Sequence, residues 1–142
     1  MKKLVLMMVA AMITSLTFAQ KIQEKDVPAL VKASFQKQYP NIKEVKWDKE
    51  GEKFEASFDL NKIDNSVLFD SKGNILETEE EIELAQLPKG VLEYVINNYK
   101  GQNVKEAAKI TDANGIVTYE AEIKGMDLLF DSNGKFIKEV KE

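Results

Sequence analysis

The second half of this chain repeats the first. Residues 66–76 read SVLFDSKGNIL, and residues 127–137 return as DLLFDSNGKFI. The segments that precede these copies also match, since a Val-Pro leading to Tyr39 is answered by a Leu-Pro leading to Tyr99. A unit of about 55 residues that occurs twice must bury the same faces twice. The duplication therefore constrains the fold far more than it constrains the function.

Each repeat is predicted to begin with an amphipathic helix. In the first repeat, Asp26 is expected to cap a helix with Pro28 in its first turn, where a missing N–H costs nothing. Pro40 ends the first helix and Gly101 is the expected stop of the second. In both helices apolar residues recur at steps of three and four, which predicts one buried face. These residues are Val27, Leu30, Val31, Phe35 and Tyr39 in the first helix, and Val91, Leu92, Val95, Ile96 and Tyr99 in the second.

Strands are predicted to follow each helix, because the hydrophobic period changes from about 3.6 to 2. Phe54, Ala56 and Phe58 alternate with polar residues in the first repeat, and the second repeat has the same alternation. The last two strands of each repeat flank Asp-Ser-Lys-Gly, from Asp70, and Asp-Ser-Asn-Gly, from Asp131. Such tetrapeptides are typical of a type I turn closed by a glycine at a bulge.

The predicted fold class is α+β. Two tandem α-β4 repeats, at about residues 26–79 and 86–142, are expected to form one antiparallel sheet of about eight strands. Both helices pack on one face of this sheet, within a single domain of residues 20–142. The other face stays open, and a function would have to lie there.

Residues 1–19 have the pattern of a secretory signal peptide. Lys2 and Lys3 precede an apolar stretch that ends in Thr-Phe-Ala. The apolar run is shorter than the roughly 18–20 residues of a membrane span, and no cysteine follows it for lipid attachment. We therefore expect a mature chain that begins at Gln20, has no membrane span, and is periplasmic or secreted.

The composition excludes several classes of chemistry. The chain has 20 lysines and 24 acidic residues, with no arginine, histidine or cysteine. Without Lys2 and Lys3, 18 lysines face 24 acids, a net charge of −6, which repels nucleic acid. Catalytic triads and zinc sites need the absent histidine or cysteine. We expect neither an enzyme nor a bound cofactor.

Candidate partner-binding residues lie on the predicted open face of the sheet. Leu68 and Leu129 occupy equivalent places, and each points away from neighbours that should face the helices. Leu76 and Ile137 are expected to join them. Apolar side chains on an otherwise charged face form a contact patch, which a partner protein or a second copy of the chain would use equally well.

Two further features have two interpretations each. Trp47 is the only tryptophan, and Lys109 aligns with it in the second repeat. It is either a hot spot for a partner or a core residue beneath the first helix. The glutamates at positions 77, 79, 80, 81 and 83 form either a solvated linker between the repeats or a site for a basic partner.

The turns that bear aspartate raise the question of calcium. Asp70, Asp112, Asn114 and Asp131 all lie in predicted turns. A Ca²⁺ ion takes six to eight oxygen ligands, whereas aspartate at such a turn already binds backbone N–H groups. We therefore expect no metal site, with weak calcium binding as the alternative.

Several motifs follow one another in a fixed order along the chain. They are V-P-x-x-V-x-x-x-F-x-x-x-Y-P at residues 27–40, V-K-W at 45–47, F-E-A-S-F at 54–58 and the two L-F-D-x-x-G hairpins. In this order, the motifs resemble the PepSY-like, β-lactamase-inhibitor-like (BLIP-like) periplasmic proteins. The resemblance spans the mature chain and implies a two-helix, eight-strand fold with a non-enzymatic role in the cell envelope. Inhibitors of this shape grip an enzyme with the concave sheet face and protruding loops, although this chain has no cysteines for their disulfides.

The sequence thus predicts an exported, non-catalytic binding or inhibitor-like protein. Its expected partner is a protein or peptide of the cell envelope, held by the open sheet face. A calcium- or small-ligand-responsive periplasmic protein is the alternative.

Overall fold

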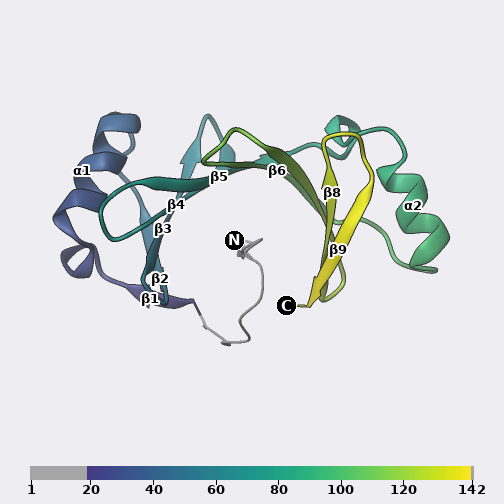
Figure 1. The fold of residues 1–142 in the computed structure, drawn as a ribbon, viewed down its shortest axis with the longest axis horizontal. Coiled ribbons are helices and arrows are strands. Elements are labelled where there is room, and N and C mark those ends of the chain that lie inside the picture. Colours follow the sequence, from purple (N-terminus) through teal and green to yellow (C-terminus); the bar gives the residue numbers. More distant parts are fainter. Residues whose placement is uncertain (1–18, 142) are drawn as a thin grey trace. The chain divides into compact units, whose positions relative to one another are not determined.

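The computed structural model describes residues 19–141, so the predicted signal peptide lies almost wholly outside the described residues (Figure 1). The chain divides into two compact units, which separate between Thr78 and Glu79. Unit 1 contains the first repeat and unit 2 contains the second.

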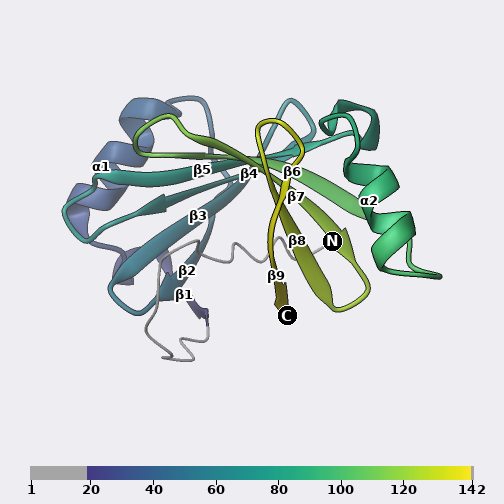
Figure 2. The same cartoon turned by 45° about the vertical axis from the view of Figure 1, so that its right-hand side comes forward.

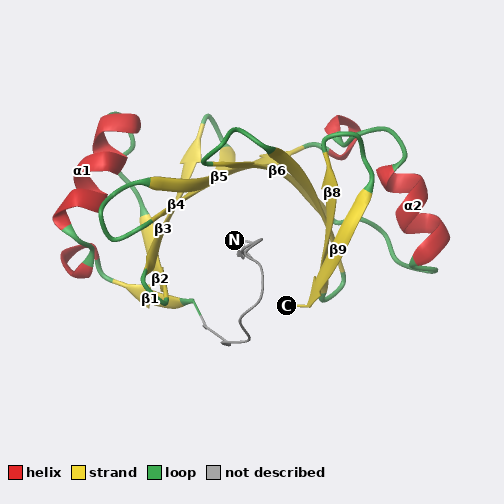
Figure 3. Ribbon diagram, viewed as in Figure 1, coloured by secondary structure: helices red, strands yellow, loops and turns green. Residues whose placement is uncertain are grey.

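Unit 1 has one α-helix, which lies between its first and second strands in chain order (Figure 3). A short first strand and a single 3-10 turn precede the helix. Its elements are β1 (Gln20–Ile22), the 3-10 turn (Glu24–Asp26), α1 (Ala29–Gln38), β2 (Lys46–Glu50), β3 (Lys53–Leu60), β4 (Ile63–Phe69) and β5 (Ile75–Ile82), the last of which crosses into unit 2.

Unit 2 has the same order of elements after its 3-10 turn. These elements are the turn (Leu84–Gln86), α2 (Val91–Asn98), β6 (Glu106–Asp112), β7 (Val117–Ile123), β8 (Met126–Asp131) and β9 (Phe136–Lys141).

The predicted α+β class is confirmed, with nine strands rather than eight. The strands hydrogen-bond in chain order from β1 to β9, and the registered pairs are antiparallel. The additional strand is β1, which places Ile22 opposite Trp47 of β2. Three residues are too few for an alternating pattern to be visible in the sequence.

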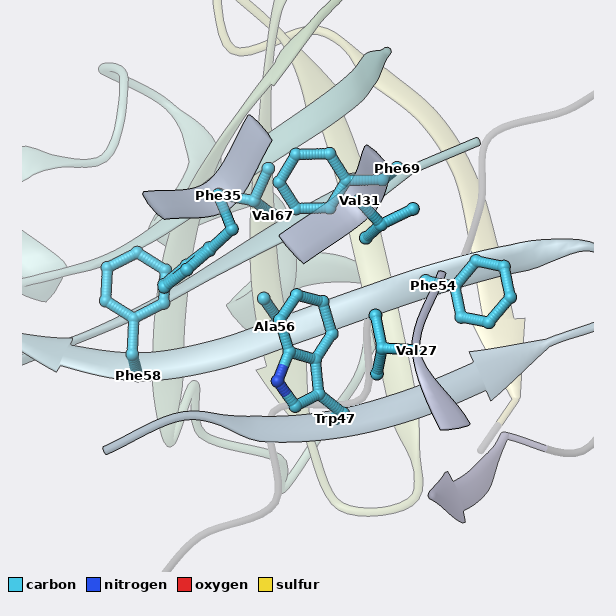
Figure 4. Packing of buried hydrophobic residues seen from close by; sticks show 9 residues of the cluster. All are labelled: Val27, Val31, Phe35, Trp47, Phe54, Ala56, Phe58, Val67 and Phe69. Carbon is cyan, nitrogen blue, oxygen red and sulfur yellow. The ribbon is translucent and has the colours of Figure 1, made fainter. Parts of the chain in front are cut away.

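The core of unit 1 lies between α1 and one face of its strands (Figure 4). Phe35 of α1 packs edge-on against Trp47, with ring centroids 5.6 Å apart, and against Phe58 at 5.1 Å. Trp47 is only 5% exposed and belongs to this core, together with Val67 and Phe69. The structure thus places Trp47 beneath the helix and not on a binding surface. Trp47 lies opposite Ala56 in the strand pair, so both side chains point to the face that the helix covers.

The core of unit 2 follows the same plan with different side chains. Val91 and Val95 of α2 pack on Ala121, Ile123, Leu128 and Phe130. Tyr94 stacks on Phe136, with centroids 4.9 Å apart and planes 15° from parallel.

Both helices bury a narrower stripe than the sequence predicts. Leu30, Leu92 and Ile96 were expected on the buried faces, yet they are 62%, 40% and 66% exposed. Helices of ten and eight residues bury mainly one pair at a spacing of four, Val31 with Phe35 and Val91 with Val95.

The start of each helix also differs from the prediction. Pro28 is itself the N-cap of α1, and Asp26 ends the preceding 3-10 turn without capping the helix. The N-cap of α2 is Gly90, whose φ of 94° suits glycine.

The two Asp-Ser-x-Gly turns have the predicted geometry and pack against the helix starts. The Gly73 N–H donates to the Asp70 carbonyl at 3.0 Å, and Gly73 has a φ of 84°. A Cβ atom on Gly73 would lie 2.6 Å from the Leu30 carbonyl oxygen, and one on Gly134 would lie 2.7 Å from that of Lys89. Each glycine therefore permits both the turn and its close approach to the helix.

The strand register changes one correspondence between the repeats. Trp47 lies opposite Ala56, and Ala107 lies opposite Ala121. Because Ala56 and Ala121 each follow the equivalent glutamate in their strands, Trp47 corresponds to Ala107 and not to Lys109.

Candidate binding face

Each unit has a strand face that its own helix does not cover. Figures 1 and 2 show α1 lying along one side of β2–β4, and within the described residues of unit 1 no second helix lies on the other side. We call the side away from the helix the distal face of the unit. Side chains reach it from every second residue of a strand.

The strand register defines the distal face of unit 1. Asp48 lies opposite Glu55, and Glu55 lies opposite Leu68. Lys21 of β1 extends this row beyond Asp48. In the next row Ser66 lies opposite Ser57. The face is polar and charged apart from Leu68.

Leu68 and Leu129 point to the distal faces as predicted, but they are not accessible. Each is 1% exposed, whereas the predicted contact patch requires exposed leucines. Both lie in strands that have neighbours on each side. The cross-strand neighbour of Leu68 is Glu55, and that of Leu129 is Glu120. Neither leucine meets a partner directly in this conformation.

Leu76 and Ile137 behave differently from those two leucines. Leu76 is half-buried, and Ile137 is 47% exposed. The pairing of β8 with β9 shifts after Leu129, so that Lys138 lies opposite Leu129 and Ile137 falls outside that row. Ile137 is therefore an exposed residue at a strand irregularity, a place where sheets depart from strict alternation.

Glu55 has the most perturbed environment on the distal face of unit 1. Its side chain is 3% exposed and its Oε1 atom has no hydrogen-bond partner. Burial raises the pKa of this carboxyl from 4.5 to about 8, and the negative charges of Glu50, Asp48 and Glu77 add to the increase. Glu55 is therefore mostly protonated at neutral pH.

Two neighbours complete this environment. Ser66 is fully buried, and its hydroxyl acts against the rise in the Glu55 pKa, although its Oγ makes no hydrogen bond of standard geometry. Burial and the charge of Asp48 raise the pKa of Glu50, while Lys53 lowers it. Buried oxygen atoms without partners lose the hydration they would have in the unfolded chain.

The distal face of unit 2 has different side chains at the same positions. Ala108 lies opposite Glu120, and Glu120 lies opposite Leu129. Glu120 thus corresponds to Glu55, but Ala108 stands where unit 1 has Asp48. Asp127, which lies opposite Glu122, takes the place of Ser66.

The comparisons with known proteins decide the family. A family profile described as "Putative beta-lactamase-inhibitor-like, PepSY-like" matches twice, at residues 16–77 and 52–138. The chain belongs to this PepSY-like family. The two matched ranges overlap at residues 52–77 and together span both repeats. A comparison with curated proteins gives no match.

Solved structures share the PepSY-like fold. A DUF2874 family protein from Bacteroides uniformis is 21% identical, with a TM-score of 0.70 over 80% of this chain and 88% of its own. A BLIP-like protein from Bacteroides fragilis is 24% identical, with a TM-score of 0.64 over 80% and 86%. A periplasmic protein from Bacteroides eggerthii is 16% identical, with a TM-score of 0.71 over 81% and 88%. At these identities the likeness concerns the fold.

The acidic run of this PepSY-like chain is a strand and not a solvated linker. Its residues belong largely to β5, where Glu77 is 9% exposed and Glu79 is 2% exposed. Strand β5 lies between β4 and β6 in the strand order, and Glu77 and Glu79, two residues apart, point to the same side of it. Glu80 and Glu83 are the exposed members of the run.

The aspartate turns use their oxygen atoms locally. Asp70 Oδ1 accepts the N–H groups of Lys72 and Asn74, each at 2.9 Å. The Asp112 and Asp131 carboxylates do the same at 2.8 and 2.9 Å. Between residues 19 and 141, no three acidic side chains are arranged to hold a metal ion.

Sequence reasoning did not single out Glu55, Ser66, Asp48 or Glu50. The available signal was the position of Glu55 between Phe54 and Ala56, in a strand that would be interior to the sheet.

Neither described helix is both long and apolar enough to cross a membrane.

Proposed function

We propose that this chain is an exported, non-catalytic protein that binds a protein or peptide of the cell envelope through the distal face of its strands. The observation that supports this most is the one-sided cover of each unit. In each unit the helix and the aromatic cluster lie on one side of the strands, while the other side has polar and charged side chains from adjacent strands. On such a face, alternate side chains of adjacent strands form rows that a partner can contact.

The setting of the proposal comes from the family and from the N-terminal sequence. The neighbour from Bacteroides eggerthii is described as periplasmic, and residues 1–19 have the pattern of a signal peptide. The family description names likeness to a β-lactamase inhibitor, which is a protein-binding role. We do not extend this to any particular enzyme, since fold likeness alone does not transfer a target.

The partner surface is expected to be basic. The chain from Gln20 onward has 18 lysines and 24 acidic residues. Asp48 and Glu50 are partly exposed on the distal face of unit 1, and Glu106 and Glu122 are partly exposed on that of unit 2. Complementary charge would speed association and select among partners more than it would raise affinity.

A site-specific photo-crosslinking experiment tests the proposal. A benzophenone amino acid is placed at Lys21 or Lys46, which are exposed on the distal side, and at Gln36 on the exposed side of α1 as the control. In intact cells we expect one defined adduct from the distal positions and none from Gln36. The captured protein, once purified, should bind the wild-type chain, and added salt should weaken that binding. Adducts that are the same from all three positions, or absent, would contradict the proposal.

A further inference from the structure

Two buried oxygen atoms on the distal face of unit 1 lack hydrogen-bond partners. They are Oε1 of Glu55, whose side chain is 3% exposed, and Oγ of Ser66, which is fully buried. Almost all buried polar groups in proteins are satisfied, because an unmet one costs stability. Two such atoms in one place indicate that this pair of residues has a use beyond packing.

The two side chains lie next to one another. Glu55 pairs with Leu68, and Ser66 lies two residues from Leu68 on the same side of β4. Residues related diagonally in this way are about 7–8 Å apart at their backbones, within reach of a glutamate side chain. The Ser66 hydroxyl lowers the pKa of the Glu55 carboxyl in the manner of a hydrogen bond, so the two groups lie close together, although no hydrogen bond of standard geometry joins them.

The charges around this pair favour a cation. Asp48 and Glu50 of β2 and Glu77 of β5 all act on the Glu55 carboxyl as negative charges. The lysines of strands β1 to β3 are Lys21, Lys46, Lys49 and Lys53. Lys21 lies opposite Asp48, Lys46 lies opposite Ser57 and Lys53 acts on Glu50, whereas the charges that act on the Glu55 carboxyl are negative. The potential at the two oxygen atoms is therefore negative.

The donor set suits an ammonium group better than a metal ion. In the described chain no three acidic side chains come together as metal ligands, and Ca²⁺ takes six to eight oxygen atoms. A primary ammonium needs only acceptors for its three N–H groups and is a compact unit charge. One carboxyl oxygen and one hydroxyl oxygen on adjacent strands provide two of those acceptors.

We propose that Glu55 and Ser66 form a receptor for a primary ammonium group, such as the end of a lysine side chain. The identification of that lysine with the basic partner rests on the proposed function, whereas the receptor itself does not. Binding requires side chains on this face to move, because the two oxygen atoms have almost no exposed surface.

Proton release accompanies binding. The free protein holds Glu55 mainly as the neutral acid at pH 7, since its pKa is about 8. The bound ammonium remains protonated and favours the carboxylate, so the carboxyl proton passes to the solvent. Binding therefore lowers the pKa of Glu55.

The receptor is specific to unit 1. The positions of Asp48 and Glu50 are taken by Ala108 and Ile110 in unit 2, and Asp127 replaces Ser66. Among these four positions, only that of Glu55 has the same residue type in unit 2, where it is Glu120.

The test follows the carboxyl carbon of Glu55 by NMR in protein labelled at the glutamate carboxyl carbons. The wild-type chain is titrated with acid and base in n-butylammonium chloride and, separately, in tetramethylammonium chloride at the same ionic strength. We expect butylammonium to lower the pKa of Glu55 by about one unit at saturation. Tetramethylammonium has no N–H donors and should leave that pKa unchanged. Equal effects of the two salts, or no effect of butylammonium, would overturn the receptor.

Two variants refine the result. Ser66→Ala should reduce the butylammonium effect, whereas Ser57→Ala, which alters the residue opposite Ser66, should preserve it. Amide spectra of both variants verify folding, and an equal loss in both would contradict a role for Ser66. The crosslinking experiment tests the proposed function separately from the receptor. If a partner is captured but butylammonium has no effect, only the receptor is disproved. An ammonium effect without any captured partner removes only the proposed function.

Discussion

The two units have similar helix-facing sides and dissimilar distal faces. On the distal side, Glu55 and Glu120 occupy equivalent positions beside Leu68 and Leu129. Unit 1 adds Asp48 next to its glutamate, and unit 2 has Ala108 there. The two copies have therefore kept the arrangement that the fold requires. They differ in the side chains of the distal face, which is the face that we propose binds a partner.

The cores also differ, but in a compensating way. Unit 1 places its large rings at Phe35 and Trp47, where unit 2 has Val95 and Ala107. Unit 2 places Tyr94 and Phe136 together instead. The large rings therefore occupy different positions in the two cores, while each core is still formed between the helix and the strands of its unit.

The largest predicted effect tests whether Ala107, and not Lys109, occupies the position that corresponds to Trp47. Trp47→Ala should lower the free energy of unfolding by about 3–5 kcal/mol, because a large buried ring leaves a cavity. Lys109→Ala should change it by less than about 0.5 kcal/mol, since Lys109 does not occupy the corresponding place. Urea denaturation followed by far-UV circular dichroism measures both. Similar losses would mean that the register-based correspondence of Trp47 with Ala107 is wrong.

The second prediction concerns the distal face of unit 1. Folding raises the pKa of Glu55 from 4.5 to about 8, so the folded state binds more protons than the unfolded state between these values. The stabilisation is complete below pH 4.5 and is lost as pH rises towards 8. We expect the wild-type free energy of unfolding to fall by roughly 3 kcal/mol from pH 5 to pH 8 because of Glu55.

Glu55→Gln should remove this component, since glutamine resembles the neutral acid. At pH 8 the variant should be more stable than the wild type, and at pH 5 the two should be similar. Glu52→Gln, at an exposed position in the β2–β3 turn, serves as the control. Urea denaturation at a series of pH values measures the difference, and parallel curves for wild type and Glu55→Gln would contradict the assignment.

The third prediction concerns the turns that the units share. Gly73→Ala and Gly134→Ala should each cost about 2–3 kcal/mol, because a Cβ atom adds a backbone clash to an unfavourable positive φ. Gly125→Ala has a similar φ of 73° but nothing within 4 Å, so it should cost about 1 kcal/mol. Thermal unfolding of the three variants gives the order. A loss at Gly125 equal to the others would show that the approach to the helix start contributes nothing.

Local patterns predicted the parts of this fold that depend on local interactions. The Asp-Ser-x-Gly turns, the helix positions and the alternation of Phe54, Ala56 and Phe58 follow from propensity and periodicity. The alternation also gave the correct side for Leu68. It did not give the burial of Leu68, because alternation defines a direction and not what neighbouring strands contribute on that side.

Other features depend on pairing between strands and so were not visible in the sequence. Charge density made residues 77–83 look like a linker, but β5 has a strand on each side. Asn61 and Lys62 form a tight turn with positive φ between β3 and β4, and this turn likewise accompanies the pairing of the two strands. The importance of Glu55 likewise arises from its neighbours across the sheet.

The smallest predicted effect separates the turns from a calcium site. The side-chain amide and the backbone N–H of Asn74 donate hydrogen bonds to the Asp70 carboxylate and hold the pKa of that carboxyl below its usual range. These bonds occupy the oxygen atoms that calcium would need, and Asp112 and Asp131 bind backbone N–H groups in the same way. We therefore expect the melting temperature in millimolar Ca²⁺ to equal that in chelator, within about 1 °C. Mg²⁺ at the same concentration controls for screening of the negative charge. A rise that Ca²⁺ produces and Mg²⁺ does not, and that Asp112→Asn removes, would instead support the calcium-responsive alternative and place the response in unit 2.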